Sequence, residues 1–360
     1  SDESAFKLLE SGKISFIVYT GALMDETIDE YIALSRKALF LGIPCFTSLD
    51  TATAATDIIA SHYTQQNTEL VDINNMRETR QVFEFSKMQA TGDDYIFIEN
   101  FDGRVTCPES LCVTLCDRHF GIGANGIVLL EKSQIADMKM RIFNTDGTEG
   151  EMAGNCIRCV AKYTYDNGYA EGRDTIKIET KLGVNEVKVY TSDGRVTYAT
   201  ASMGKPSLLA KDVPVNLPLE KVFNYPCVIV NHVYNLNCVS MGNPHCVVFC
   251  DSVDKIDLEV EGPKFEHHKI FPERVNTEFV RVVNDTMLKM RVYERGSGVT
   301  MACGTGACAA VVAACENGFC EKDTDVTVKV PGGDLIVRYT DDDVTLSGDA
   351  KFVFKGLFEY

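Results

Sequence analysis

Short apolar runs, separated by glycine turns, follow one another along most of the chain. Their length and alternation predict strands at residues 83–88, 95–98 and 138–143, among others, because runs of this kind bounded by turn residues are typical of strands. Two longer helical patterns lie among them, at about 155–167 and 305–317. One long helix wrapped by many strands in each half predicts an α+β architecture with strongly curved sheets.

The two halves repeat each other at an offset of 150 residues. Lys139-Met-Arg-Ile-Phe-Asn144 corresponds to Lys289-Met-Arg-Val-Tyr-Glu294 without a gap. The correspondence continues to the glycine turns, where Gly154 matches Gly304 and Ala153 matches Cys303. We therefore expect two pseudo-symmetric halves whose glycine turns face one cleft, with a thiol on one side only.

The first block of the chain has a different pattern. A short apolar run at 14–19, a helical pattern at 27–41 and a second apolar run from residue 45 predict a partial α/β segment, followed by a helix from about 52 to 61. Polar residues then predict a linker. The expected domains are a partial α/β segment at 1–75, one half at 82–215 and the other at 222–360.

Composition and charge exclude several classes of protein. A chain of 360 residues accommodates two or three domains. Its formal charge of −17 disfavours nucleic acid and anionic membrane as partners, and we see neither an apolar run that would span a bilayer nor a signal-peptide pattern. The chain is expected to be cytoplasmic. The chain has fourteen cysteines, and only Cys156 and Cys159 have the Cys-x-x-Cys spacing. Because a zinc site usually needs a second such pair, we expect no metal site. Most of the cysteines are expected to be buried free thiols.

The glycine turn at Gly304-Thr305-Gly306 indicates an anion site. The first N–H groups of a helix are unpaired and carry the positive end of its dipole, and a substrate carboxylate or phosphate binds there readily. Cys303, directly before the helix, is expected to have a lowered pKa and to act as a base. Backbone donors on a carboxylate would also stabilise a carbanion formed at the adjacent carbon.

Two facing halves suit the inversion of an α-carbon, which needs one group to remove a proton and another to deliver one on the opposite face. A cofactor is not expected. Gly121-Ile-Gly-Ala-Asn-Gly126 has the Gly-x-Gly-x-x-Gly spacing of a dinucleotide-binding motif. That motif, however, follows a strand and precedes a helix, whereas this segment follows a predicted helix and precedes a predicted strand.

A specific series of motifs follows in order from about residue 82 to 360: Phe85-Ser-Lys-Met88, Arg118-His-Phe-Gly-Ile-Gly123, Asn144-Thr-Asp-Gly-Thr148, Gly154-Asn155, Met241-Gly-Asn-Pro-His-Cys246, Phe271-Pro-Glu-Arg-Val-Asn276, Glu294-Arg-Gly-Ser-Gly298 and Ala302-Cys303-Gly304-Thr-Gly306. Through these motifs this part of the chain resembles diaminopimelate epimerase, a cofactor-independent two-thiol epimerase. The resemblance implies a small amino-acid substrate, no cofactor and a homodimer. It also implies Cys303 as an acid/base and His245 as a supporting residue near the thiols. The substrate-binding residues that it implies are Asp93, Asn144, Gly154, Asn155, Asn243, Asn276, Glu294, Arg295, Gly304 and Thr305.

Three positions depart from the family pattern. The family's first cysteine falls on Ala153, its usual Asn near the start falls on Asp93, and its usual Asp before Gly126 is Asn125. A carboxylate at 93 would repel an anionic substrate unless it is protonated or paired. Cys156, three positions after Ala153, is a tentative substitute for the missing thiol, and the alternative is a packed small residue.

The N-terminal segment resembles the end of the regulatory domain of the carbamoyl phosphate synthase large subunit, which has a methylglyoxal-synthase-like fold. Gly12-Lys-Ile-Ser-Phe-Ile-Val18 and Gly42-Ile-Pro-Cys-Phe-Thr-Ser-Leu-Asp-Thr-Ala52 carry this resemblance. Half a parallel sheet leaves an open edge, so we expect a structural appendage rather than an effector site.

The sequence leaves three functions open. The first is an amino-acid epimerase acting on a diaminopimelate-like substrate. The second is a one-thiol isomerase or dehydratase on the same fold. The third is a catalytically silent protein that binds the substrate through its carboxylate.

Overall fold

A computed structural model describes residues 2–19, 28–46, 51–53, 56, 82–150 and 154–359. The chain divides into two compact units, Ser1–Arg80 and Gln81–Tyr360. The expected linker after residue 65, most of the helix expected at 52–61, and Ala153 lie outside the described residues.

The N-terminal unit contains a short parallel pair of strands with helices. Helix α1 (Asp2–Glu10) is followed by β1 (Ile17–Val18), α2 (Ile28–Phe40) and β2 (Cys45–Phe46). The two strands pair in parallel, with Ile17 opposite Cys45. The expected β-α-β order is therefore present, and α1 is an additional helix that the sequence pattern did not indicate.

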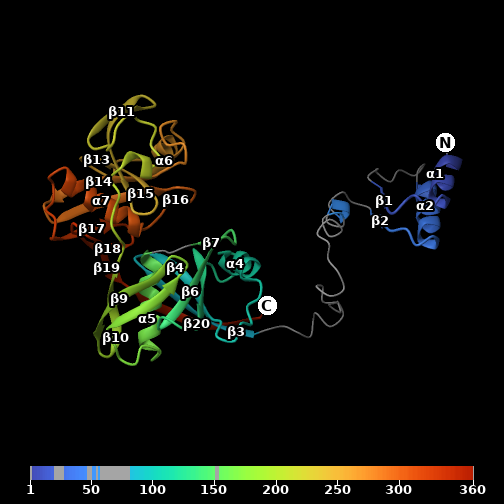
Figure 1. The fold of residues 1–360 in the computed structure, drawn as a ribbon, viewed down its shortest axis with the longest axis horizontal. Helices are drawn as coiled ribbons and strands as arrows, with labels where there is room; N and C mark the ends of the chain where they lie inside the picture. The colour runs from blue at the N-terminus through green and yellow to red at the C-terminus, as the bar shows by residue number, and fades with distance from the viewer. Residues whose placement is uncertain are drawn as a thin grey trace. The chain divides into compact units, whose positions relative to one another are not determined.

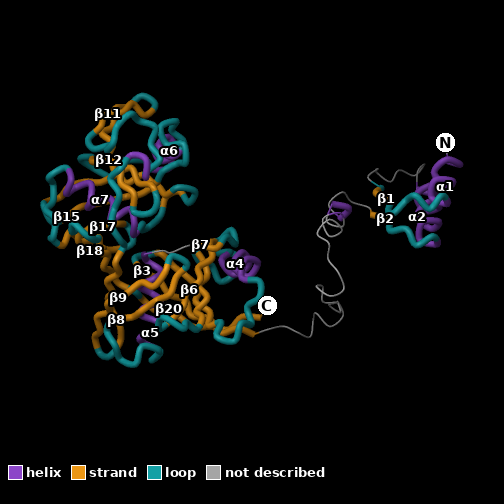
Figure 2. Tube along the Cα trace, in the orientation of Figure 1, coloured by secondary structure: helices purple, strands orange, loops and turns teal. Residues whose placement is uncertain are grey.

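Most of the regular secondary structure of the second unit consists of strands, which surround the central helices α5 (Gly154–Asp166) and α7 (Gly304–Glu316), while α4 (Pro108–Cys116) and α6 (Leu258–Glu266) are further helices of this unit (Figures 1 and 2). Its first half consists of β3 (Val82–Ala90), β4 (Asp93–Glu99), α4 (Pro108–Cys116), β5 (Gly126–Glu131), β6 (Met138–Asn144), β7 (Glu149–Gly150), α5 (Gly154–Asp166), β8 (Thr175–Thr180), β9 (Gly183–Ser192) and β10 (Arg195–Ser202).

The second half repeats this order. It consists of the 3₁₀ turn η1 (Ala210–Asp212), β11 (Tyr225–Ile229), β12 (His232–Ser240), β13 (Pro244–Phe249), α6 (Leu258–Glu266), β14 (Asn276–Asn284), β15 (Met287–Glu294), β16 (Gly298–Val299), α7 (Gly304–Glu316), β17 (Asp325–Val330), β18 (Gly333–Tyr339), β19 (Val344–Asp349) and β20 (Lys351–Glu359).

The two halves share their unusual strand pairings. In the first, β4 runs parallel to β5 and β6 runs parallel to β8. In the second, β13 runs parallel to β14 and β15 runs parallel to β17. These matched pairings confirm the pseudo-symmetric α+β fold that the 150-residue repeat predicts.

Helices α5 and α7 form the centres of the two halves. In α5 every residue from Gly154 to Thr164 is buried, and α7 is buried from Gly306 to Ala314. A helix that is buried on all sides lies in a core rather than on a surface. Strand side chains that alternate inward pack on each helix and complete two separate apolar clusters.

The sheets of the two halves are joined by hydrogen bonds. Strand β10 pairs with β19, and the last strand, β20, pairs with β3 along nearly its whole length. The sequence divides the unit into halves at 82–215 and 222–360. Strand β20 belongs to the second of these ranges, but it pairs with β3 in the sheet of the first half. Within the described residues, no helix is long and apolar enough to cross a membrane.

Candidate active site

A cavity of about 850 Å³ lies where the two halves meet, and the first turns of α5 and α7 both reach it. Its wall is formed by Gly92, Asp93, Tyr95, Arg118, Asn125, Asn144, Thr145, Gly154, Asn155, Leu182, Met241, Gly242, Asn243, Glu294, Gly296, Ser297, Val299, Thr300, Met301, Ala302, Cys303, Gly304 and Thr305. Both glycine turns of the repeat therefore face one cavity, as the offset predicts.

The two helix starts lie close together, and both begin with glycine. A methyl group placed on Gly304 would lie 2.9 Å from Leu346 Cδ2, and one on Gly154 would lie 3.1 Å from the same leucine atom. The methyl group on Gly304 would lie 3.7 Å from the Gly154 Cα, which is an ordinary contact. Glycine at both positions therefore leaves room for Leu346 beside the helix starts and their unpaired N–H groups.

Cys303 is the N-cap residue of α7. Its backbone is extended, and its Sγ accepts a hydrogen bond from the Gly306 N–H at 3.3 Å. The hydroxyl of Thr305 lies 3.5 Å from the same sulfur. The thiol thus faces two donors in the first turn of the helix, at the cavity wall.

The pKa of the Cys303 thiol is well above its ordinary value, which is opposite to the expected lowering. Burial is the main cause, and the carboxylates of Glu294 and Glu278 add to it, while the bonds from Thr305 and Gly306 act in the other direction. The side chain is only 7% exposed, so loss of water around the thiolate outweighs the helix terminus.

A chain of hydrogen bonds runs from Cys303 into the core of the second half. Thr305 Oγ1 accepts from Asn243 Nδ2 at 3.3 Å, and Asn243 Oδ1 lies 2.9 Å from His245 Nε2. The other ring nitrogen, His245 Nδ1, lies 2.7 Å from Glu278 Oε1. His245 is completely buried, so it supports the thiol side of the cavity through Asn243 and Thr305 without lining the wall.

Glu278 is a residue that sequence reasoning missed. Its side chain is fully buried on β14, and its Oε2 has no hydrogen-bond partner among the described residues. An acidic residue directly before the apolar pair Phe279-Val280 was the available signal. Buried carboxylates are rare unless paired, and here His245 is the partner.

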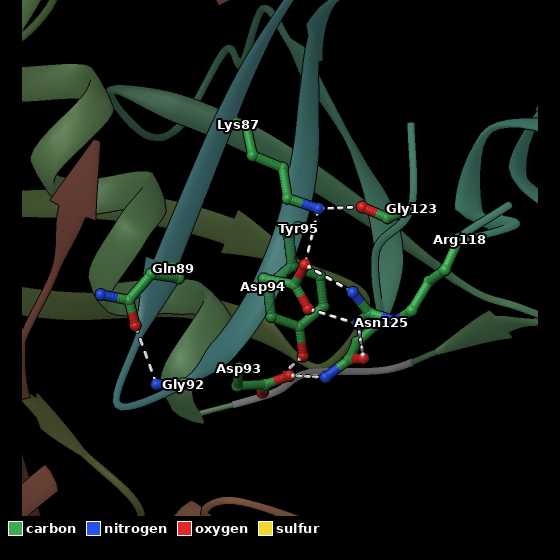
Figure 3. Close-up of polar contacts among 9 residues, drawn as sticks. All are labelled: Lys87, Gln89, Gly92, Asp93, Asp94, Tyr95, Arg118, Gly123 and Asn125. Carbon is green, nitrogen blue, oxygen red and sulfur yellow. Dashed lines mark hydrogen bonds and ion pairs between the residues drawn. The ribbon is translucent and has the colours of Figure 1, made fainter. Parts of the chain in front are cut away.

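The first half contributes the Asp93 carboxylate to the cavity wall, where three side chains donate hydrogen bonds to it. Oδ2 accepts from Tyr95 Oη at 2.8 Å and Oδ1 accepts from Asn125 Nδ2 at 2.8 Å, as Figure 3 shows. Oδ2 also accepts from Asn155 Nδ2 at 3.2 Å. Burial raises the pKa of Asp93 in spite of these bonds, and neighbouring Asp94 adds to the rise. The Asp93 carboxylate therefore has three hydrogen-bond donors within the protein, and it does not face the substrate without a partner.

Asp94 differs sharply from its neighbour. It forms ion pairs with Lys87 at 2.6 Å and with Arg118 at 2.7 Å, and Figure 3 shows both cations converging on it. Burial alone would raise its pKa, but the bonds from Arg118 and Lys87 lower it. Arg118 Nη2 also donates to Asn125 Oδ1 at 2.8 Å, which fixes the amide that holds Asp93.

Glu294 brings a second carboxyl group to the cavity. It accepts a hydrogen bond from the Thr300 hydroxyl. Burial raises the pKa of Glu294 to about 7, and the charges of Asp93 and Glu278 contribute to the rise. A carboxyl group with this pKa changes its charge near neutral pH and is suited to pairing with a substrate ammonium group.

We expect the contribution of Glu294 to stability to fall as pH rises from about 4.5 to about 7. In this window the folded protein keeps a proton that the unfolded chain has released, so deprotonation favours unfolding. The test compares wild-type and Glu294→Gln free energies of unfolding in urea. The wild-type free energy of unfolding should decline relative to that of Glu294→Gln between about pH 4.5 and about pH 7. A difference that stays constant over this range would contradict the raised pKa of Glu294.

The structure brings most of the expected site residues together. Those that line the cavity are Asp93, Asn144, Gly154, Asn155, Asn243, Glu294, Cys303, Gly304 and Thr305. Asn276, which is buried, and Arg295, which is exposed, do not line the cavity. Asn276 donates to the Pro244 carbonyl and accepts from the Arg295 N–H, and the Arg295 guanidinium donates to the Glu273 carbonyl. Tyr95, Arg118 and Asn125 line the cavity and were not expected as site residues.

Cys156 does not line the cavity. It is fully buried in the apolar cluster around α5, and burial raises the pKa of its thiol well above the ordinary value. The helical geometry explains this placement: a residue two positions after Gly154 points to the side of α5 that packs on the strands. The structure therefore favours the packed small residue over the tentative substitute thiol.

Comparison with known proteins is consistent with this architecture. The sequence model of the diaminopimelate epimerase family matches residues 85–209 and 237–353. The diaminopimelate epimerase of Acetivibrio thermocellus is 45% identical over 274 residues, which cover 76% of this chain and 97% of that protein. That of Methanococcus maripaludis strain C5 is 42% identical over 274 residues, covering 76% and 98%.

Solved structures with the same fold have diverged further in sequence. A PhzF-family phenazine biosynthesis protein of Bacillus anthracis aligns with a TM-score of 0.57 at 16% identity, covering 78% of this chain and 99% of that one. A hydroxyproline epimerase from Agrobacterium vitis aligns with a TM-score of 0.55 at 14% identity, covering 78% and 92%. The sequence matches reach almost the full length of the relatives and include the residues around both helix starts. The chain belongs to the diaminopimelate epimerase family.

Proposed function

We propose that this chain is a cofactor-independent amino-acid epimerase that converts LL-diaminopimelate to the meso form, a step towards lysine and peptidoglycan precursors. The observation that carries the proposal is the thiol of Cys303 at the start of α7, on the wall of a cavity that α5 also reaches. The names of the relatives supply the substrate.

The arrangement provides what α-proton removal requires. A substrate carboxylate at the starts of α5 and α7 receives backbone N–H donors from both helices. Those donors stabilise the negative charge that develops when the α-carbon loses its proton. Glu294, with a pKa of about 7, lines the same cavity and would pair with the α-ammonium group.

The proton equilibrium of Cys303 is expected to change when substrate binds. The pKa of its thiol is raised mainly by burial, and the charge of the nearby Glu294 is a further cause. An ammonium group bound to Glu294 would neutralise that charge and lower the pKa of the thiol. Substrate binding would then generate the thiolate where it is used.

The test is incubation of LL-diaminopimelate with the full chain in deuterium oxide. We expect deuterium at one α-carbon together with inversion to the meso isomer, measured by mass spectrometry and chiral chromatography. Exchange without inversion, or loss of water, would support a one-thiol isomerase or dehydratase. Saturable binding with no exchange would identify a silent binding protein, and either result would overturn the proposal.

The remaining features of this function are also proposals. A homodimer in the cytoplasm is the arrangement implied by the family resemblance, with an amino acid as the partner molecule rather than nucleic acid or a membrane. The family model begins at residue 85, so the N-terminal unit lies outside it. The parallel pair β1–β2 is compatible with a methylglyoxal-synthase-like remnant, which we propose to be a structural appendage.

A further inference from the structure

Two-sided proton transfer leaves one role in the cavity without an occupant. Cys303 belongs to the second half, and the equivalent position of the first half is Ala153, whose methyl side chain cannot carry a proton. Cys156 is buried in the core. A second acid/base for the proposed epimerase reaction therefore has to come from another residue on the cavity wall.

Among the described lining residues, the first half contributes three ionisable side chains: Asp93, Tyr95 and Arg118. Arg118 is held by a two-point ion pair with Asp94, and a guanidinium does not release its proton in proteins. The pKa of Tyr95 is raised well above its ordinary value by burial and by Asp93, so it acts as a donor to Asp93. Of these three described side chains, the Asp93 carboxyl group is the one suited to give and take a proton, because Tyr95 and Arg118 are both held as hydrogen-bond donors.

The position of Asp93 places this carboxyl group next to both helix starts. Asn155 Nδ2, in the first turn of α5, donates to Asp93 Oδ2 at 3.2 Å and to the Ala302 carbonyl at 3.3 Å. One amide nitrogen thus bridges the carboxyl group and the residue that precedes Cys303. Asp93 Oδ1 accepts from Asn125, and a carboxylate oxygen has a second lone pair that can take a proton.

A hydrogen bond from Asn125 also fixes the position of the Asp93 carboxyl group. Asn125 Nδ2 donates to Asp93 Oδ1 at 2.8 Å (Figure 3). This amide orients the carboxyl group at the start of β4, where Asp93 Oδ2 also accepts from Asn155.

We propose that Asp93 is the second catalytic acid/base and replaces the thiol missing from the first half; this inference rests on the proposed epimerase function. In one direction, the Cys303 thiolate takes the α-proton and becomes a thiol, while the Asp93 carboxylic acid gives its proton to the opposite face of the α-carbon and becomes a carboxylate. The configuration is inverted, and the electron pair of the broken C–H bond forms the new one. The reverse reaction exchanges the two roles.

The activities of the two proposed bases, Cys303 and Asp93, can be measured one at a time with the two α-epimers of 3-fluorodiaminopimelate. Removal of the α-proton by either base lets fluoride leave with its electron pair as a Cα–Cβ double bond forms, and no second proton transfer is needed. Each epimer presents its α-proton to one face only. Fluoride release from each epimer, followed with an ion-selective electrode, therefore reports one base at a time.

We expect Asp93→Asn to slow fluoride release from one epimer by about 10²-fold or more and to leave the other within a few-fold of wild type. Cys303→Ala should show the opposite selectivity, and neither variant should epimerise diaminopimelate. The preserved epimer in each variant demonstrates that the protein is folded and still binds substrate. As a matched control, Asp93→Asn/Asn125→Asp keeps the amide–carboxyl pair in the other orientation and should resemble Asp93→Asn.

Three results would overturn the role of Asp93. Release from both epimers at wild-type rates in Asp93→Asn would show that another group is the base. Equal losses for both epimers would assign Asp93 to substrate binding, and recovered epimerisation in the double variant would assign the effect to the hydrogen-bonded pair. If wild type epimerises nothing and Cys303→Ala leaves both epimers unaffected, the proposed function itself has failed.

Discussion

Replacing Cys303 by serine is expected to lower the turnover of diaminopimelate epimerisation by about 10²- to 10⁴-fold, the usual contribution of a general acid/base. A serine hydroxyl is far less acidic than a thiol, and it does not form the anion that removes the α-proton. The fold should persist, because serine is a favoured N-cap residue and Cys303 is the N-cap of α7. Turnover at saturating substrate is the measurement, with circular dichroism to compare the folds.

Cys156→Ala is the matched control, since it removes a thiol from the start of the other helix. Cys156 is buried in the core and does not line the cavity. We expect turnover within a few-fold of wild type and a loss of about 1 kcal/mol in the free energy of unfolding, as for other core truncations. Near-wild-type turnover in Cys303→Ser, or a collapse in Cys156→Ala, would reverse the assignment of the two thiols.

Removal of Glu278 should have the largest effect on stability. Glu278→Ala is expected to reduce the free energy of unfolding by about 1–3 kcal/mol, because a buried polar group that loses its hydrogen-bond partner carries its full desolvation penalty. The partner is the Nδ1 of fully buried His245, 2.7 Å from the carboxylate. Urea unfolding measures the loss, and epimerisation should decline with it because His245 positions Asn243 beside Thr305 and Cys303.

A partly exposed carboxylate supplies the comparison for Glu278. Glu261 pairs with Lys264 at 2.7 Å on the surface of α6, and pairs of this kind contribute roughly 0–1 kcal/mol. Glu261→Ala should therefore change the free energy of unfolding by less than about 1 kcal/mol. A Glu278→Ala loss no larger than that of Glu261→Ala would mean that the buried pair is not a stabilising contact.

The repeat made the framework of the second unit predictable from sequence. Helices expected at about 155–167 and 305–317 are observed as Gly154–Asp166 and Gly304–Glu316. The agreement has a physical origin, because a glycine turn, a long apolar stretch and a closing Asn-Gly define a helix locally. Strand β20 was not expected, and its partner β3 lies more than 250 residues earlier in the chain, so no local pattern reveals the pairing.

The details of the site depended on contacts that a sequence does not display. The expected lowering of the Cys303 pKa was wrong because burial and two acidic neighbours, Glu294 and Glu278, outweigh the helix terminus. The bond between Asp93 and Asn125 joins residues on different elements. Arg295 illustrates the same limit, since its position next to Glu294 gave no sign that its guanidinium would reach the Glu273 carbonyl instead of the cavity.

The strand pairs β10–β19 and β20–β3 have a consequence for how the cavity admits its substrate. Main-chain hydrogen bonds join β10 of the first half to β19 of the second, and β20, which follows β19 in the chain, pairs with β3 in the sheet of the first half. The two halves are therefore not rigid bodies swinging on a flexible tether. Any widening of the gap between the starts of α5 and α7 has to twist or flex these continuous ladders. Access is therefore an elastic deformation of one sheet system with a restoring force, and the relaxed sheet returns both helix starts to the same spacing after each turnover.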